Sequence, residues 1–343
     1  MEKLYFASDY MDCAHPSVLK KLCDNNYAHA AGYGSDTCSE TARAKIREAC
    51  CCPGADIFFL TGGTQANVTV IDTVLHPWQG VISATSGHVQ IHEAGAVEFS
   101  GHRVIALPNH YGKITAEQID DCVAQYWGDD NHEHMVMPGM VYLSHPTEYG
   151  TLYSLQELEE IRKVCTARDL ALFIDGARFA YALACPANDV TLPDLARLCD
   201  VFVIGGTKCG TLFGEAVVIP VSGYIPHFVT QCKQHGALLA KGFVNGLQFD
   251  ALFTDNLYQQ IGAGAIEKAD RIREALVSRG YQLGMPSPTN QIFFIVDDAK
   301  REALEKQVDM SFMERVDDKH TMMRFCTSWA TREEDVDALI AIL

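Results

Sequence analysis

The 343-residue sequence has no apolar run approaching the roughly 20 residues that span a bilayer. Its first residues lack the charged, apolar and small-residue regions of a signal peptide. Basic residues are fewer than acidic ones, 27 against 44, and the net charge is −17. Nucleic acids and anionic membranes both require a basic face, so this charge disfavours them as partners. We therefore expect a cytoplasmic protein with neither kind of partner.

Cysteine pairs with the spacing of a metal site are also missing. The 13 cysteines include the adjacent Cys50-Cys51-Cys52, but they form no C-x-x-C pair and no zinc-finger series with histidine. We expect free thiols in a reducing compartment and no metal site. The chain is 48% apolar and 21% charged, and its length allows one large domain and a smaller one.

Strand-like and helical segments alternate through the middle of the chain. The expected strands are residues 140–144, 170–174, 201–204 and 216–221. Ser154, with Glu157 three residues later, predicts the capped start of a helix. Pro220 predicts that the last of these strands ends there or lies near an edge. The alternation predicts a mostly parallel sheet with helices on both faces, in which ligands bind beyond the carboxyl ends of the strands.

After about residue 240 the pattern changes. The expected elements are a charged helix over residues 263–280 and strands over residues 291–296 and 322–326. Thr331 is expected to cap a final helix, with Glu334 in the reciprocal position. We predict a large α/β domain of residues 1–240, N-terminal segment included, and a small α+β domain of residues 241–343.

Two charged residues follow neighbouring strands of the predicted sheet. Asp175 follows residues 170–174, and Lys208 follows residues 201–204. Taken singly, Asp-Gly is a common turn signal and a lysine is usually solvated. Together they suit pyridoxal phosphate, which needs an amine for its aldehyde and a carboxylate that keeps its ring nitrogen protonated. The pair predicts a pyridoxal phosphate site.

Four further features fit such a site. The segment Thr61-Gly62-Gly63-Thr64 follows an apolar strand and opens a helix, so its N–H groups could bind a phosphate, although any strand-to-helix turn favours glycine. His88 could stack on a planar ring or be a histidine bonded within the core. Arg178 could bind a ligand or pair with a surface acid. Arg324 lies in an apolar strand, where its charge requires a carboxylate from the protein or a substrate.

These residues together resemble the L-threonine aldolase family, within the aspartate-aminotransferase-like (fold type I) pyridoxal phosphate enzymes. The matching segments run almost end to end: Ser8-Asp9, residues 32–36, residues 61–67, His88 with residues 93–95, residues 175–178, residues 206–208 and residues 324–329. The resemblance implies an α/β fold with a mostly parallel sheet and a smaller C-terminal α+β domain. It also implies dimers or tetramers with shared sites, so that Tyr33, Lys233 or Lys241 would serve a neighbouring subunit.

The resemblance also implies the role of each site residue. Lys208 would bind the cofactor aldehyde, Asp175 would pair with the ring nitrogen, and His88 would stack on the ring. Gly63 and Thr64 would hold the phosphate. Ser8, Arg178 and Arg324 would bind the substrate carboxylate. Arg178 would also contact the cofactor.

One segment departs from the family pattern. Many members carry Glu-Asn-Thr-His-Asn after the strand that corresponds to residues 141–143, and the histidine contacts the substrate hydroxyl side. This chain has Ser144-His145-Pro146-Thr147-Glu148. We expect Thr147 in the matching place, with His145 two residues earlier. The family's substrate-side histidine is therefore not carried over.

We expect a carbon–carbon lyase of the threonine aldolase type. It would cleave L-threonine, L-allo-threonine and related β-hydroxy-α-amino acids to glycine and an aldehyde, with His88 as the candidate base at the β-hydroxyl. The same cofactor site would also serve a β-eliminating lyase or a racemase acting on another small amino acid. A protein that binds pyridoxal phosphate without catalysis is the third interpretation.

Overall fold

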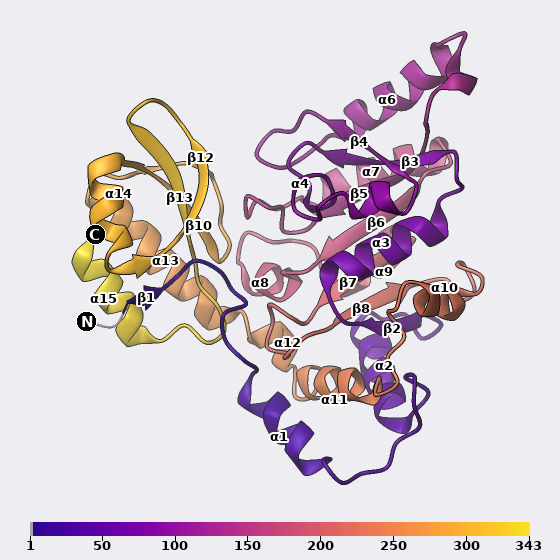
Figure 1. Cartoon of the computed structure of the whole chain (residues 1–343), viewed down its shortest axis with the longest axis horizontal. Helices are drawn as coiled ribbons and strands as arrows, with labels where there is room; N and C mark the ends of the chain where they lie inside the picture. Colours follow the sequence, from indigo (N-terminus) through magenta and orange to yellow (C-terminus); the bar gives the residue numbers. More distant parts are fainter. Residues whose placement is uncertain (1–2) are drawn as a thin grey trace.

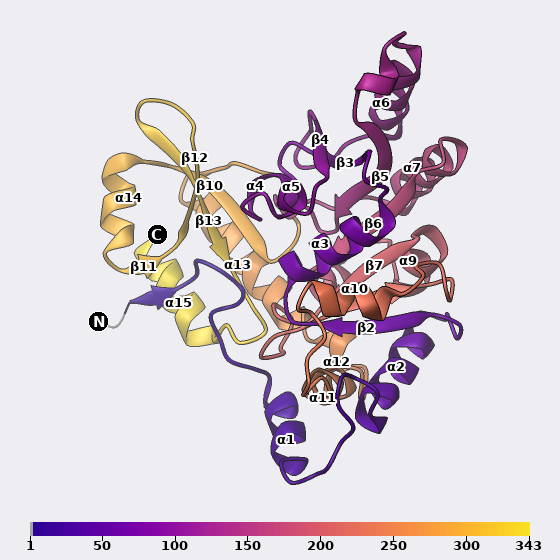
Figure 2. The same cartoon turned by 45° about the vertical axis from the view of Figure 1, so that its right-hand side comes forward.

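The computed structural model describes residues 3–343 and has a large and a small lobe, with both ends of the described chain in the small lobe (Figures 1 and 2). The large lobe is built on a seven-stranded sheet with the order β2-β8-β7-β6-β5-β3-β4. Its strands are β2 (Asp56–Leu60), β3 (Gln79–Ala84), β4 (Arg103–Leu107), β5 (Met137–Ser144), β6 (Ala171–Gly176), β7 (Val201–Gly205) and β8 (Glu215–Ile219).

The pairs β3–β4, β3–β5, β5–β6 and β6–β7 are parallel, and only β8 runs antiparallel to its two neighbours, β2 and β7, within the described sheet. The predicted mostly parallel sheet is therefore confirmed. Pro220 directly follows the last residue of β8, which is an interior strand, so proline marks the end of this strand and not an edge.

Helices cover both faces of this sheet (Figures 1 and 2). The helices of the large lobe are α1 (Pro16–Asp24), α2 (Thr37–Ala49), α3 (Gly63–Val74), α4 (His88–Ile91), α5 (Ala96–Phe99), α6 (Ala116–Gly128), α7 (Leu155–Ala167), α8 (Phe179–Ala184), α9 (Leu192–Leu198), α10 (Phe228–Gln234), α11 (Phe243–Leu252) and α12 (Leu257–Gln260). Strand β5 shows the two faces: Met140 and Tyr142 join the core on the α3 side, and Val141 and Leu143 join the opposite core. Strands buried on both faces are apolar throughout.

The predicted start of α7 is confirmed in detail. Ser154 accepts a hydrogen bond from the Glu157 backbone N–H, and the Glu157 carboxylate accepts one from the Ser154 N–H. The two residues thereby satisfy N–H groups that the first turn of a helix leaves free. Among residues 3–343, no helix is long and apolar enough to cross a membrane.

The small lobe carries a four-stranded antiparallel sheet with the order β12-β13-β10-β9. Its strands are β9 (Gln282–Leu283), β10 (Gln291–Asp297), β12 (Ser311–Arg315) and β13 (His320–Cys326), and its helices are α13 (Ala263–Ser278), α14 (Asp298–Glu305) and α15 (Glu333–Ile342). The predicted cap of α15 is wrong by one residue. Arg332 precedes the helix, and Thr331 Oγ1 instead accepts a hydrogen bond from the Ser328 N–H, which holds it outside the first turn.

The described chain passes from the small lobe to the large lobe after β1 and returns to the small lobe between α12 and α13. Strand β1 (Leu4–Tyr5) pairs in parallel with β11 (Val308–Asp309) of the small lobe. Helix α11 packs on α1 and α2 of the large lobe, where Asp250 forms ion pairs with Lys21 and Lys45. The division of the chain at residue 240 stays a prediction.

Leu172, the second residue of β6, is fully buried. We predict that Leu172→Ala lowers the free energy of unfolding by about 2–5 kcal/mol, because it removes apolar contact and leaves a cavity. Urea titration followed by tryptophan fluorescence measures the change. The matched variant Leu19→Ala, at a side chain 38% exposed on α1, should cost less than about 1 kcal/mol. Equal losses in the two variants would contradict this account of the core.

Candidate active site

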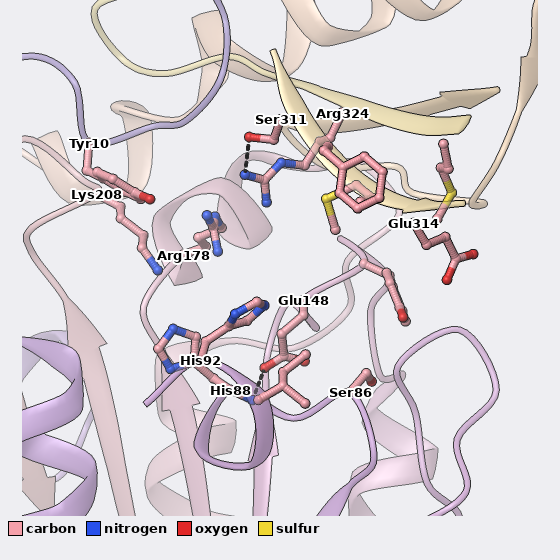
Figure 3. Close-up of a pocket in the computed structure, with 15 residues that line it drawn as sticks. Tyr10, Ser86, His88, His92, Glu148, Arg178, Lys208, Ser311, Glu314 and Arg324 are labelled. Atoms are coloured by element: carbon pink, nitrogen blue, oxygen red, sulfur yellow. Dashed lines mark hydrogen bonds between the residues drawn. The ribbon is translucent and has the colours of Figure 1, made fainter. Parts of the chain in front are cut away.

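Two adjoining cavities lie where the carboxyl ends of the large-sheet strands face the small lobe. The inner cavity, about 380 Å³, is lined by residues that include Thr61, Gly62, Gly63, Thr64, Ser144, Asp175, Thr207 and Glu215. The outer cavity, about 450 Å³, reaches the small lobe and is lined by residues that include Ser86, Ile91, Tyr149, Ser311, Phe312, Glu314 and Arg324 (Figure 3). Six residues line both: Tyr10, His88, His92, Glu148, Arg178 and Lys208.

Asp175, at the end of β6, is only 5% exposed. Its carboxylate accepts hydrogen bonds from Tyr142 Oη at 2.7 Å, Asn67 Nδ2 at 3.0 Å and the Ala177 N–H at 2.9 Å. Burial alone would raise the pKa of Asp175, but the nearby His88, the Asn67 and Tyr142 bonds and Lys208 outweigh it and lower this pKa. The group is therefore a stable anion inside the cavity.

Lys208 reaches the same cavity from the loop between β7 and β8. This loop lies very close to the one after β6, since a Cβ on Gly205 would stand 2.3 Å from the carbonyl oxygen of Ala177. Lys208 Nζ has no hydrogen-bond partner within the described chain. Burial and the charge of Arg178 lower the pKa of the Lys208 amine, against the opposing pull of nearby carboxylates. A lowered pKa favours the neutral, nucleophilic amine.

Helix α3 begins at the wall of the inner cavity. No side chain caps its N-terminus, and a Cβ on Gly62 or Gly63 would meet no heavy atom within 4 Å. The first N–H groups of the helix are thus open to the cavity, together with the Thr64 side chain. Such a helix start suits a phosphate, because its free N–H groups and its dipole both favour an anion.

His88 is the first residue of α4, and its side chain is 30% exposed, so it is not a core histidine. Its Nδ1 lies 2.7 Å from Glu93 Oε1, and its backbone N–H donates to Glu148 Oε1 at 2.8 Å. Glu93 Oε1 also accepts from Asn67 Nδ2 at 2.8 Å. Asn67 thereby links the environment of His88 to that of Asp175.

Arg178 forms a two-pronged ion pair with Asp9, with Nε–Oδ2 at 2.6 Å and Nη2–Oδ1 at 3.0 Å. Asp9 is 2% exposed and also accepts from Asn290 Nδ2 at 3.0 Å. The partner of Arg178 is thus a buried carboxylate of the same chain and not a surface acid. Burial would raise the pKa of Asp9, but Arg178, Lys208 and Asn290 lower it to about 2. Arg178 Nη1 has no hydrogen-bond partner among residues 3–343.

Arg324, on β13, has no carboxylate within 4 Å in the described part of the chain. Among residues 3–343, its guanidinium donates only to neutral groups: Gln291 Oε1 at 2.8 Å, the Ala7 carbonyl at 3.1 Å and Ser311 Oγ at 3.1 Å. Figure 3 shows it at the small-lobe wall of the outer cavity. An uncompensated cation in this position is well placed for an anionic ligand.

Ser8 is not brought to these cavities. It lines a separate hollow of about 540 Å³ with residues that include Met11, Cys326 and Asp335. The neighbouring Asp9 points to Arg178, so Ser8 lies on the other side of the segment, and Tyr10 lines the inner and outer cavities instead.

The segment from Ser144 to Glu148 is the one that departs from the family pattern. His145 is fully buried and its ring contacts Tyr153 and Phe179, while Thr147 bonds to Thr151. Neither His145 nor Thr147 lines the two cavities.

Glu148 lines both cavities instead, and Ser144 Oγ donates to its Oε1 at 2.5 Å. Glu215, also missed from sequence, lines the inner cavity and accepts from the Gly206 N–H at 3.1 Å. The only sequence signal for Glu148 was its place in the segment that departs from the family.

Comparisons with known proteins agree with this picture. A family model described as beta-eliminating lyase matches residues 6–308. A low specificity L-threonine aldolase from a Pseudomonas strain is 29% identical, covering 98% of this chain and 96% of its own. A solved threonine aldolase from Leishmania major has 40% identity and a TM-score of 0.96, covering 99% of this chain and 98% of that one. The aspartate aminotransferase of Thermus thermophilus, at 15% identity and a TM-score of 0.73, covers 99% and 90% and confirms the predicted fold.

Removing the charge of Asp9 would leave the Arg178 cation buried without its partner. We predict that Asp9→Asn lowers the free energy of unfolding by about 3 kcal/mol at pH 7. Because folding lowers the pKa of Asp9 from 3.8 to about 2, its contribution is full above pH 3.8 and is lost as the pH falls toward 2.

The difference between wild type and Asp9→Asn should therefore shrink by about 1 kcal/mol between pH 5 and pH 3. Urea titrations at these pH values measure it. Asp121→Asn, at an exposed carboxylate on α6, serves as control and should show neither effect. A pH-independent difference for Asp9→Asn would show that the ionised pair is not its source.

Proposed function

The chain belongs to the β-eliminating lyase family, and we propose that it is a pyridoxal phosphate-dependent enzyme that cleaves L-threonine, L-allo-threonine and related β-hydroxy-α-amino acids to glycine and an aldehyde. The observation that carries this proposal is the convergence at one sheet edge of three groups: a stably ionised Asp175, the amine of Lys208 and the uncapped start of α3. The similarity to threonine aldolases over nearly the whole chain supports the reaction.

The donor set of the inner cavity fits pyridoxal phosphate. We propose that Lys208 holds the cofactor aldehyde, Asp175 pairs with the ring nitrogen, and the N–H groups at Gly63 and Thr64 hold the phosphate. His88, with its ring fixed by Glu93, would lie against the cofactor ring. When bound, pyridoxal phosphate supplies an electron sink for the electron pair left on Cα after bond cleavage.

The remaining work falls to the protein side chains. We propose that Arg324, with the free Nη1 of Arg178, binds the substrate carboxylate and so fixes which bond at Cα can break. Asp9 holds the Arg178 guanidinium in place from behind. A base then removes the β-hydroxyl proton as the Cα–Cβ bond opens to give the aldehyde.

We further propose that the enzyme is a cytoplasmic homodimer or homotetramer with shared active sites. Tyr33, Lys233 and Lys241 do not line the two cavities of the single chain. Lys233 Nζ lies 4.8 Å from the centre of the exposed Tyr33 ring, so both can be presented to a neighbouring subunit.

Purified protein should release acetaldehyde from L-threonine and from L-allo-threonine, measured with a coupled alcohol dehydrogenase. We predict that Lys208→Ala lowers this rate by at least about a hundredfold, because the amine that holds the cofactor is lost. Lys20→Ala, on the exposed face of α1, is the matched control and should keep the wild-type rate. A yellow, cofactor-loaded wild type that releases no aldehyde would contradict the proposal and favour a β-eliminating lyase or a racemase.

Arg324 tests the binding of the substrate carboxylate. We predict that Arg324→Lys raises KM for L-threonine roughly 10- to 100-fold, because a lysine keeps the charge but loses the two-pronged bond. The turnover number kcat should change much less. Arg315→Lys, on the adjacent strand β12, controls for the substitution itself, since Arg315 pairs with Asp298 outside the cavity. An unchanged KM in Arg324→Lys would remove Arg324 from the binding site.

A further inference from the structure

We propose that Glu148 is the base that takes the proton from the substrate's β-hydroxyl group. The inference rests on the proposed function and deepens it by naming a catalytic residue for the cleavage step. Glu148 follows β5 closely and lines both the inner and the outer cavity, as do Lys208 and Arg178. Figure 3 shows its carboxylate inside the pocket, across from Arg178 and Arg324. It therefore stands between the cofactor side and the carboxylate-binding side of the site.

The two oxygens of Glu148 have different surroundings. Oε1 accepts a hydrogen bond from Ser144 Oγ at 2.5 Å and another from the His88 backbone N–H at 2.8 Å. Oε2 receives no hydrogen bond from residues 3–343 and is not sealed off from solvent. One oxygen thus fixes the carboxylate while the other is left to accept a proton, as a positioned base requires.

Charged and titratable groups surround Glu148 on several elements. Ser144 and Tyr142 come from β5, His88 and His92 from the α4 segment, and Asp175 from β6. Around the same cavities stand the cations Lys208, Arg178 and Arg324 and the phenol of Tyr149. Burial raises the pKa of Glu148, and the negative charge of Asp175 raises it further. The hydrogen bonds from Ser144 and the backbone and the charge of His88 lower this pKa, but the net shift is upward. A carboxylate with a raised pKa is a stronger base than an ordinary carboxylate.

The two histidines nearby are less suited to this role. His88 has its Nδ1 bonded to Glu93 and is proposed to hold the cofactor. His92 lines both cavities, and its ring contacts the His88 ring, but no hydrogen bond within the described chain fixes its direction. Burial and four neighbours, His88 first among them, lower the pKa of His92, which makes it a weaker base than an ordinary imidazole.

The proton and electron accounts of this step balance without a further reactant. The β-hydroxyl proton moves to Glu148 Oε2, and the oxygen–Cβ bond becomes the carbonyl of the aldehyde. The electron pair of the Cα–Cβ bond remains with Cα. A proton is then added at Cα to give glycine, and Glu148 returns its proton to solvent, so one proton is transferred overall from oxygen to carbon.

The test compares two reactions of Glu148→Gln in the cofactor-loaded enzyme. The first is aldehyde release from L-threonine, L-allo-threonine and β-phenylserine. The second is exchange of the glycine α-proton in D2O, followed by NMR, which needs the cofactor but has no β-hydroxyl. Glutamine can keep the bonds to Ser144 and the His88 N–H, so the site's shape is preserved. Thermal melting and the cofactor's absorption spectrum check folding and loading.

We expect kcat for aldehyde release to fall by about 10²- to 10⁴-fold in Glu148→Gln, while glycine exchange stays within about threefold of wild type. The rise of kcat/KM with pH that accompanies ionisation of Glu148 should disappear. Glu148→Asp, which retains a carboxylate, should recover part of the rate. The control Glu117→Gln, at an exposed residue of α6, should behave as wild type.

Three results would overturn the inference alone, and they are distinguishable. If wild type cleaves and Glu148→Gln cleaves within threefold of it, Glu148 is not the base. If cleavage and glycine exchange fall together, Glu148 only positions the site. If His92→Asn abolishes cleavage and spares exchange while Glu148→Gln does not, the base is His92. A wild type that exchanges the glycine proton but cleaves none of the three substrates would refute the proposed function itself, and the inference with it.

Discussion

The ionised carboxylate of Asp175 is buried near the carboxyl end of β6, an interior strand of the large sheet. A buried charge is tolerated only where close partners replace the solvent. Tyr142 and Asn67 provide these partners. Asn67 also bonds Glu93, which fixes His88, whose backbone N–H holds Glu148. The partners that stabilise the buried Asp175 anion therefore belong to one connected set of hydrogen bonds. This set runs from Asp175, which lines the inner cavity, to Glu148, which lines both cavities.

A second buried charge ties the two lobes together. Asp9 receives the Arg178 guanidinium from the large lobe and the Asn290 amide from the residue just before β10 of the small lobe. The Cys326 N–H, at the end of β13, donates to the Phe6 carbonyl at 2.8 Å. The N-terminal segment therefore holds the small lobe against the sheet edge. This contact sets where Arg324 stands relative to Lys208. The substrate orientation that we propose therefore depends on the ion pair between Asp9 and Arg178.

The parts of the site that could be predicted are those that follow from local pattern and one topological rule. Asp175 and Lys208 each follow an apolar strand, and parallel strands must bring such residues to the same edge. The partners of these residues could not be found in this way. Asp9 and Arg178 are 169 positions apart, and no local pattern pairs them. Ser8 and Glu148 lie in irregular segments, where no period fixes the direction of a side chain. The sequence therefore could not show that Ser8 lines a separate hollow, and it gave no role to Glu148.

Burial and the groups that surround each carboxyl separate three carboxyl groups of the site into two kinds. Asp175 accepts three hydrogen bonds and lies near His88 and Lys208, so its pKa is lowered in spite of burial. Glu148 has fewer donors, and burial raises its pKa. In Glu215 burial is opposed by the Thr207 bond, Lys208 and the Gly206 N–H, and its pKa still rises to about 7. Burial also lowers the pKa of the Lys208 amine. Asp175 is thereby kept as an anion by the charges of His88 and Lys208 and by its hydrogen bonds, while burial outweighs the neighbours of Glu148 and Glu215 and raises their pKa values.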